Sequence, residues 1–579
     1  MHIATPQLLL RWIACCLVAS SALAVGAQDT GTCAVGTAQG SLETTQLKAS
    51  LFNTGGLFFG GSTTSGDGYL IPKEAGISPA FATSLWVGGT VNGDLRVAAS
   101  RFGGYKFRPG PLGDAASPPR DCTTYDRIYE VSRNDVARYL ATGRATDDLR
   151  DWPVEAGAPV VDGDGVVGNY NLDGGDQPEI LGDVNAFWVM NDVGRLRDTT
   201  RTAFPWTDPL GIEVRVLAFA FDPATPNALS TPTFYRYEII NRNAQTIDSL
   251  YVSMWADPDL GDAGDDYIGT DTLHNLTYVY NASNEDSVYG EAPPAWGVQV
   301  LDGFIGLANG RDDDFDGQVD EADEELRLSS APQMLKSRGG GFGQAIEPRE
   351  YFNKQRGRFG NGLPMRTGQQ GISDPMYGIE ATGPETVFVY PADPATEAYW
   401  SEVNMDGTGE DSPSGDRKMI ATTGPGRLGP GESVELVYVM PYGQGSDHIQ
   451  SVEVLRQQAD VLRSVYDAGG ITFRPVGRNE YRGGGDEPPE RQLEVSRVNP
   501  NPSAPDGAAS AVLVLPDEAR VRATVYDALG RQLDVLVDDE LAEGETVLQM
   551  PDGLAPGTYV LQVEVSPGAV QAVPFTVVR

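Results

Sequence analysis

The stretch Val521-Arg522-Ala523-Thr524-Val525-Tyr526-Asp527-Ala528-Leu529-Gly530 decides the fold that we expect for the C-terminal segment. Its first half alternates apolar and polar residues, so that Val521, Ala523 and Val525 fall on one face of an extended chain. This period of two is typical of a strand with one buried face. The residues Asp527 to Gly530 then supply a turn, because Asp and Gly favour such backbone conformations.

Four further strands are predicted after this turn, and the segment starts with Asn499-Pro500-Asn501-Pro502, in which the prolines exclude a helix. Short strands separated by turns indicate a small immunoglobulin-like β-sandwich over residues 493–579. The predicted strands are Leu533 to Val537, Thr546 to Met550, Tyr559 to Val565 and Ala569 to Val578.

Three motifs occur in order along this segment: Pro500-Asn501-Pro502, Val525-Tyr526-Asp527-Ala528-Leu529-Gly530-Arg531 and Leu554-Ala555-Pro556-Gly557-Thr558-Tyr559, with a basic terminus at Arg579. Together they resemble the C-terminal (type A) sorting domain of cargo proteins of the type IX secretion system in Bacteroidetes-like bacteria. The resemblance implies export through the secretion machinery of the outer membrane, followed by release or by anchoring on surface polysaccharide. The alternative is a generic immunoglobulin-like accessory domain, because such folds recur without a shared function.

Residues 1–27 read as a signal peptide. Arg11 precedes the mostly apolar run Trp12 to Val25, and small residues at Ala22-Leu23-Ala24 and Val25-Gly26-Ala27 offer cleavage sites. The run is shorter than the ~20 residues that a transmembrane helix needs. We therefore expect no transmembrane segment in the mature chain and a route through the periplasm to the outer-membrane surface or the extracellular space.

The charge balance restricts the partners. A formal net charge of −39 and a pI near 4.3 would repel nucleic acid and anionic membranes. Two explanations for so much acid stay open and are compatible, namely a solvated surface and calcium loading. The mature chain keeps Cys33 and Cys122, which form one disulfide in an oxidising exterior or stay as two thiols.

Residues 28–480 are expected to form a large β-sandwich-like body, so the whole chain is mainly β, with a linker at residues 481–492. One amphipathic helix is predicted after the capping residue Asp447 and before Gly469-Gly470, and a shorter one over Asn134 to Thr142. The predicted strands of the body are Ser84 to Val87, Leu95 to Ala99, Ile212 to Phe221, Phe234 to Ile240, Leu250 to Trp255, Leu276 to Tyr280, Thr386 to Tyr390 and Val434 to Met440, with the central three as antiparallel neighbours.

Motifs of the body also resemble chains that carry such sorting domains, a resemblance that implies kinship and no named activity. They are Leu51-Phe52-Asn53-Thr54-Gly55-Gly56-Leu57, Leu85-Trp86-Val87-Gly88-Gly89, Phe107-Arg108-Pro109-Gly110-Pro111-Leu112, Trp255-Ala256-Asp257-Pro258-Asp259-Leu260-Gly261 and Gly415-Asp416-Arg417-Lys418.

The sharpest candidate site is the acidic loop Asn309 to Asp323. Counted from Asp312, oxygen-bearing side chains fall at alternate positions with Gly317 at position 6, which is the spacing of a calcium loop. The loop departs from an EF-hand because position 12 is Asp and no amphipathic helices flank it. A solvated acidic loop is the alternative. The predicted calcium ligands are Asp312, Asp314, Asp316, Gln318, Asp320 and Asp323.

Three weaker acidic groups are also candidates for calcium, with ordinary solvated turns as the alternative. The first runs from Asp162-Gly163-Asp164-Gly165 through Asn169, Asn171, Asp173 and Asp176. The second comprises Asp257, Asp259, Asp262, Asp265 and Asp266. The third comprises Asp406, Glu410 and Asp416.

Catalytic signatures are mostly missing from the sequence. The mature chain has only His274 and His448, with no Gly-x-Ser-x-Gly and no His-Glu-x-x-His motif. We therefore expect a non-enzymatic, calcium-stabilised binding or structural module, with an extracellular hydrolase of polysaccharide as the alternative. For that alternative a carboxylate pair would act, and some of the tryptophans Trp86, Trp188, Trp206, Trp255, Trp296 and Trp400 would line a sugar site, although core packing is their ordinary role.

Overall fold

The computed structural model describes most of the chain between Cys33 and Val577. The predicted signal peptide and linker lie outside the described residues. The described ranges are 33–59, 68–99, 101–102, 107–117, 122–193, 207–304, 327–334, 341–374, 379–480, 494–495, 498, 509–515, 518–527, 531–542, 544–551, 553–566 and 569–577.

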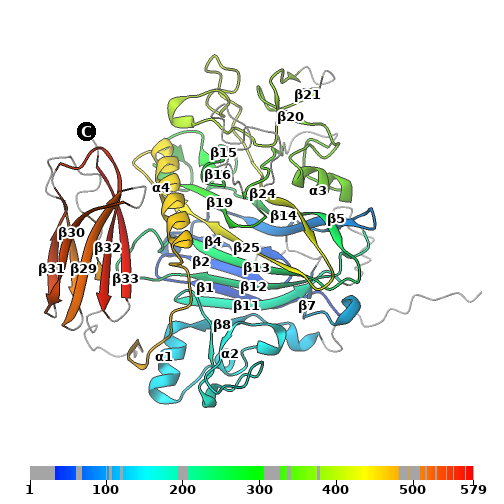
Figure 1. Ribbon diagram of the computed structural model, residues 1–579. Coiled ribbons are helices and arrows are strands. Elements are labelled where there is room, and N and C mark those ends of the chain that lie inside the picture. The colour runs from blue at the N-terminus through cyan, green and yellow to red at the C-terminus, as the bar shows by residue number, and fades with distance from the viewer. Residues whose placement is uncertain are drawn as a thin grey trace, which may run out of the picture. The chain divides into compact units, whose positions relative to one another are not determined.

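The body contains two large antiparallel sheets (Figure 1). The first has the order β1-β2-β3-β5-β14-β24, with β4 on β2 and β6 on β5. Its strands are β1 (Gln39–Glu43), β2 (Lys48–Phe52), β3 (Gly56–Leu57), β4 (Tyr69–Leu70), β5 (Ala82–Val91), β6 (Asp94–Ala98), β14 (Ile247–Asp257) and β24 (Met419–Leu428).

The second sheet has the order β15-β16-β19-β25-β13-β12-β11-β7, with β26 on β19 and β8 on β11. Its strands are β7 (Arg108–Pro109), β8 (Tyr129–Ser132), β11 (Val184–Asn191), β12 (Ile212–Ala220), β13 (Thr233–Asn241), β15 (Asp266–Asp271), β16 (Leu276–Asn281), β19 (Ala295–Asp302), β25 (Ser433–Met440) and β26 (Tyr442–Gly443).

The two sheets pack face to face, because alternate residues of their strands enter one common core. Val252 and Met254 of β14 belong to the same buried cluster as Val216 of β12 and Tyr237 of β13. The hydroxyl of Tyr438 donates across the interface to the carbonyl of Val252 at 3.0 Å. Burying side chains of this size contributes about 1.5–3 kcal/mol each. The prediction of a mainly β protein with a sandwich-like body is confirmed.

Helices cover the outer faces of both sheets. On the first sheet, α3 (Pro348–Gln355) buries Tyr351 and Phe352 against Trp86 and Trp255. On the second sheet, α1 (Arg133–Thr142) and α2 (Asp147–Arg150) join one cluster, and α4 (His448–Asp467) lies along β16 and β19. In the central strands, the side chains that point away from the common core are therefore buried as well, beneath these helices.

The two predicted helices form where the sequence places their caps. Asp447 caps α4 by accepting a hydrogen bond from the backbone N–H of Gln450 at 2.8 Å, and Gly469 adopts a positive φ after the helix ends. Ser132 caps α1 in a reciprocal pair with Asp135. Both predictions are confirmed, whereas α2 and α3 are too short to leave a clear period in the sequence.

The predicted pairing of the three central strands is wrong in one respect. β12 and β13 are antiparallel neighbours, but β14 belongs to the other sheet. The chain crosses between the sheets after Asn241, whose buried amide donates to the carbonyls of Gln245 and Leu428 at 2.9 and 3.0 Å. Both sheets bury both faces, so the three strands share one hydrophobic pattern although they do not all pair.

The predicted strand Thr386 to Tyr390 is also wrong, because only Glu385–Thr386 is extended, as β23. Phe388 and Tyr390 are buried as irregular chain. Further short strands form two-stranded ladders: β9 (Val160–Val161) with β10 (Gln177–Pro178), β17 (Glu285–Asp286) with β18 (Gly290–Glu291), β20 (Met365–Arg366) with β23, and β21 (Ser373–Asp374) with β22 (Ile379–Glu380).

The C-terminal segment forms two small antiparallel sheets, β27-β28-β31 and β30-β29-β32-β33. Val521, Ala523 and Val525 are fully buried, as their alternation predicts, and Thr524 is buried as well, next to a register shift between β29 and β30. Every member of the core cluster here lies between Val498 and Val577. The strands are β27 (Glu494–Val495), β28 (Ser510–Leu515), β29 (Ala519–Asp527), β30 (Gln532–Leu541), β31 (Gly544–Gln549), β32 (Gly557–Ser566) and β33 (Ala569–Val577).

A disulfide joins Cys33 to Cys122, which settles the choice that the sequence left open. Among the described residues, the helices lack the combination of length and apolar character that crossing a bilayer requires.

Candidate metal sites

The six predicted calcium ligands between Asp312 and Asp323 lie outside the described residues, so the structure neither supports nor opposes that site. The weaker acidic groups are described. In two of them the carboxylate oxygens of three residues all lie within 4.8 Å of one another.

The first group is the loop between β9 and β10. Asp162, Asp164 and Asp176 converge there, and Asp176 is almost fully buried. Asp176 accepts hydrogen bonds from the backbone N–H groups of Gly163 and Asn171 at 2.9 and 2.7 Å. These contacts fold the loop around its carboxylates. The carboxylate oxygens keep further lone pairs, which can bind a hard cation.

Hydrogen bonds from the side chains of Asn171 and Asn169 lower the pKa of Asp164, which therefore stays charged. The sequence predicted these residue types in this loop, and the structure brings Asp162, Asp164 and Asp176 together. Asp173 instead accepts a hydrogen bond from the hydroxyl of Tyr139 at 2.8 Å.

The second group lies where β14 ends beside the start of β24. Asp257, Asp259 and Asp416 converge on Lys418, whose ammonium contacts Asp257 and Asp416 and lies 3.7 Å from Asp259. The side chains of Lys418 and Asp257 are each 3% exposed. We call these four residues the lysine-centred group.

Burial raises the pKa of Asp257, and the charge of Lys418 opposes that rise. Next to the group, Arg417 pairs with the buried carboxylate of Glu402 at 2.6 Å. Lys418 and Arg417 therefore already neutralise part of the negative charge of these carboxylates. Lys418 occupies the position at which a metal ion would meet these three carboxylates.

The structure separates the members of the third group. Asp416 joins residues from the second group, whereas Asp406 accepts hydrogen bonds from the backbone N–H groups of Thr408 and Glu410 at 2.8 and 3.1 Å. Asp406 and Glu410 therefore form a polar turn. No spacing in the sequence connects Asp416 to Asp257, because the contact arises from strand pairing.

A charged cluster around His274 was not predicted. Its Nδ1 lies 2.7 Å from Asp271 and its Nε2 lies 3.0 Å from Asp460, while Arg456 contacts Asp271 at 2.8 Å and Asp393 at 2.7 Å. Burial opposes the charge, but hydrogen bonds to the two carboxylates outweigh it and raise the pKa of His274 to about 10. This cluster joins β15 to α4, and its contacts describe a structural role.

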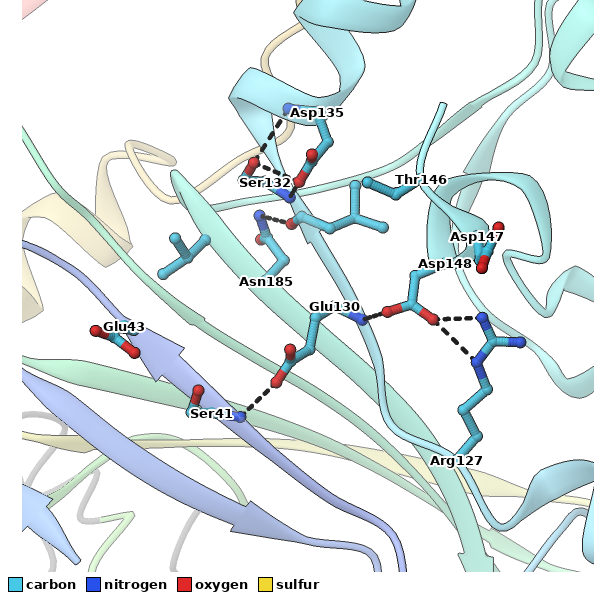
Figure 2. A pocket seen from close by; sticks show the side chains of 12 residues that line it. Ser41, Glu43, Arg127, Glu130, Ser132, Asp135, Thr146, Asp147, Asp148 and Asn185 are labelled. Atoms are coloured by element: carbon cyan, nitrogen blue, oxygen red, sulfur yellow. Dashed lines mark hydrogen bonds and ion pairs between the residues drawn. The ribbon is translucent and has the colours of Figure 1, made fainter. Parts of the chain in front are cut away.

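A cavity of about 560 Å³ lies between β1, β8, β11 and the first turns of α1 and α2. Figure 2 shows Glu130 at its centre, with Ser41 N–H donating to its carboxylate and its own N–H donating to Asp148 at 3.0 Å. Arg127 pairs with Asp148 at 2.6 Å. The wall also carries Glu43, Asp135 and Asp147, so it is mainly acidic.

Burial raises the pKa of Glu130, the hydrogen bond from Ser41 opposes the rise, and the charge of Asp148 adds to it. A carboxylic acid beside a carboxylate is the chemical minimum for glycoside hydrolysis. The described tryptophans named in the sequence do not line this cavity, because Trp86, Trp188, Trp255, Trp296 and Trp400 are all buried in cores. Trp206 lies outside the described residues.

Comparisons with known proteins give no family. No protein-family model and no curated protein matches the chain. A polysaccharide lyase of known structure is 11% identical with a TM-score of 0.18, covering 63% of this chain and 34% of that one. A beta-glucuronidase of Faecalibacterium prausnitzii is 22% identical with a TM-score of 0.11, covering 29% of this chain and 30% of that one. The chain spans about a third of the length of these proteins, and at such TM-scores neither informs its function.

Proposed function

We propose that this protein is a secreted or cell-surface protein, exported by the type IX secretion system through its C-terminal segment, with a non-enzymatic body that calcium stabilises. The observation that carries the proposal for the body is the convergence of Asp162, Asp164 and Asp176 in one loop, within 4.8 Å of one another. Carboxylate oxygens in such an arrangement are the ligands that calcium prefers.

The sorting part of the proposal rests on the three motifs of the C-terminal segment and on its packing. The core between Val498 and Val577 is built from residues of this segment alone. A label that an outer-membrane machinery recognises must fold without depending on each different cargo, and a core of its own meets that requirement.

The export proposal is tested by deleting residues 493–579 and following the protein in a type IX-competent host. We expect the truncated body to accumulate in the periplasm, and a fluorescent protein fused to residues 493–579 to reach the surface. Normal surface delivery of the truncated body would reject the sorting role.

The calcium proposal is tested by measuring thermal unfolding of the purified protein in excess calcium and in chelator. Calcium binds the folded state preferentially, so its removal should lower the unfolding temperature. An unchanged unfolding temperature would reject calcium as a stabiliser of the body. A glycan array probed with and without calcium then tests for surface polysaccharide as a partner.

A hydrolase of polysaccharide is the second candidate, and the acidic cavity of Figure 2 is the observation in its favour. Glu130 would act as the acid and Asp148 as the carboxylate, since Arg127 keeps a positive charge next to Asp148. Glu130→Gln should then abolish release of reducing ends from a susceptible polysaccharide. Activity that survives this substitution would exclude the cavity as the active site.

A further inference from the structure

The lysine-centred group joins two strands that are far apart in the chain. Asp257 is the last residue of β14, and Lys418 comes directly before β24. The two strands are antiparallel neighbours, so the end of one meets the start of the other. The two residues are separated by 161 positions, and β24 lies at one edge of the first sheet. A covalent bond between them would therefore close a large loop of chain and fasten an edge strand.

Both side chains of this pair are withdrawn from water. Each is 3% exposed, and Nζ of Lys418 contacts an oxygen of Asp257. The fold thus holds an amine nitrogen next to a carboxyl group, the two groups from which an amide forms. Fixed proximity of this kind removes much of the entropic barrier of a reaction between two groups. Exclusion of bulk water also disfavours hydrolysis, which is the reverse reaction.

A neighbouring carboxylate is in place to move the proton that amide formation displaces. Asp416 contacts the same ammonium, and an oxygen of Asp259 lies 3.7 Å from it. Oxygens of Asp257, Asp259 and Asp416 all lie within 4.8 Å of one another. Burial raises the pKa of Asp257 to about 7, so its neutral acid form is present at neutral pH. The group therefore contains a nucleophile, an acid and a base in contact.

Other buried cations of the body lack this combination. Lys354 is fully buried, and its ammonium has no hydrogen-bond partner among the described residues. Arg417 pairs with the buried carboxylate of Glu402, but a guanidinium keeps its proton and is no nucleophile. Within the part of the chain that the structure describes, Lys418 is the lysine whose buried ammonium meets a buried carboxylate.

We infer that Nζ of Lys418 and Cγ of Asp257 become joined by an intramolecular isopeptide bond once the body has folded. The ion pair is the precursor of this bond. An ammonium and a carboxylate together contain the atoms of one amide and one water molecule, so the reaction needs no oxidant and no other co-reactant. One C–O bond of Asp257 breaks, and its oxygen leaves as water with two protons from Nζ. Asp416 accepts one of these protons and passes it to the leaving oxygen.

The test is the mass of the purified wild-type protein in denaturant, after reduction of its disulfide. We expect a mass about 18 Da below the value that its sequence gives, because one water molecule is lost. Trypsin should fail to cleave after Lys418, since the ammonium has become an amide. A branched peptide should contain both residues, and its fragment masses should place the bond at Asp257. The full sequence mass, or a bond to another residue, would overturn the inference.

Two lysine variants are the matched controls. Lys418→Arg keeps a positive charge among the carboxylates but supplies no amine, so this variant should have its full sequence mass. Lys354→Met changes the other buried lysine and should keep the loss of about 18 Da. A loss that persists in Lys418→Arg would assign it to another position. The wild-type masses decide the inference even where a variant fails to fold.

Asp416→Asn tests the proton carrier, because it keeps the shape of the side chain and removes the base. The linked fraction is followed by mass after cell-free synthesis of the wild type and of the variant. We expect the bond to form about a hundredfold more slowly in the variant. An unchanged rate would reject Asp416 as the carrier. The bond requires neither calcium nor export, so failure of either part of the proposed function leaves these masses unchanged.

Discussion

The ammonium of Lys418 contacts the carboxylate of Asp257 at the point where β24 begins and β14 ends. The two residues are 161 positions apart in the chain, and both are almost fully buried. Strand pairing of Ala256 with Met419 brings them together. The contact connects the edge strand β24 to its neighbour through a buried ion pair.

Breaking this pair should be costly. Lys418→Met leaves the buried Asp257 and the partly buried Asp416 without their cation, and removing one partner of a buried ion pair typically costs about 3–5 kcal/mol. We expect a loss of this size in the free energy of unfolding, measured by denaturant titration at neutral pH. A change below about 1 kcal/mol, the usual value for an exposed pair, would show that the pair is solvated.

Lys354 gives the opposite prediction. It is fully buried in α3, its ammonium has no hydrogen-bond partner, and burial lowers its pKa to about 7. Lys354→Met should therefore stabilise the protein at neutral pH, by about 1–4 kcal/mol if it follows the replacement of other buried charges by apolar side chains. The two buried lysines serve as controls for each other, since the same substitution should act with opposite sign.

The pH dependence of Lys354→Met follows from its pKa. The folded value near 7 lies below the ordinary value of 10.5, so the native state disfavours the charged form. The penalty is full below pH 7 and fades as the pH rises towards 10.5. The stabilisation by Lys354→Met should shrink over the same range, and a constant gain would assign the effect to packing alone.

His274 should stabilise the protein most under acidic and neutral conditions. Its folded pKa of about 10 lies above the ordinary value of 6.5, so its charge stabilises the native state fully below pH 6.5. The contribution is lost as the pH rises from 6.5 through 10. The difference in unfolding free energy between the wild type and His274→Gln should shrink across this range.

His448 provides the control for that experiment. It is half-buried at the start of α4, and burial lowers its pKa. His448→Gln should therefore become more favourable relative to the wild type as the pH falls below 6.5. If both variants show the same pH profile, the ion pairs of His274 with Asp271 and Asp460 do not determine its titration.

The acidic loop that the sequence singles out remains a prediction. Asp314→Ala with Asp316→Ala should remove the part of the calcium response that depends on the loop Asp312 to Asp323. The part that depends on Asp162, Asp164 and Asp176 should persist in this variant. Thermal unfolding of the loop variant, of Asp164→Asn and of their combination, each with and without calcium, measures the two contributions separately. A loop variant with the full wild-type response would reject the loop as a calcium site.

The sequence was sufficient for features that depend on neighbouring residues. Alternation identified β12, β13 and β29, and the cap at Asp447 identified the start of α4. Local patterns record which face is buried and where a helix begins, because those properties are set within a few residues. The sequence also placed acidic residues in the loops that hold the candidate sites.

Only the tertiary structure decided which of these acids meet, and with what. The sequence grouped Asp257 with Asp262 and Asp265, yet the structure places Asp257 on Lys418 and leaves the other two with Asn281 and Asp286. The crossing of β14 to the other sheet was equally invisible, since both sheets bury both faces. The physical reason is that burial and pairing between distant strands determine the charge balance of a site, and neither leaves a periodic signal in the chain.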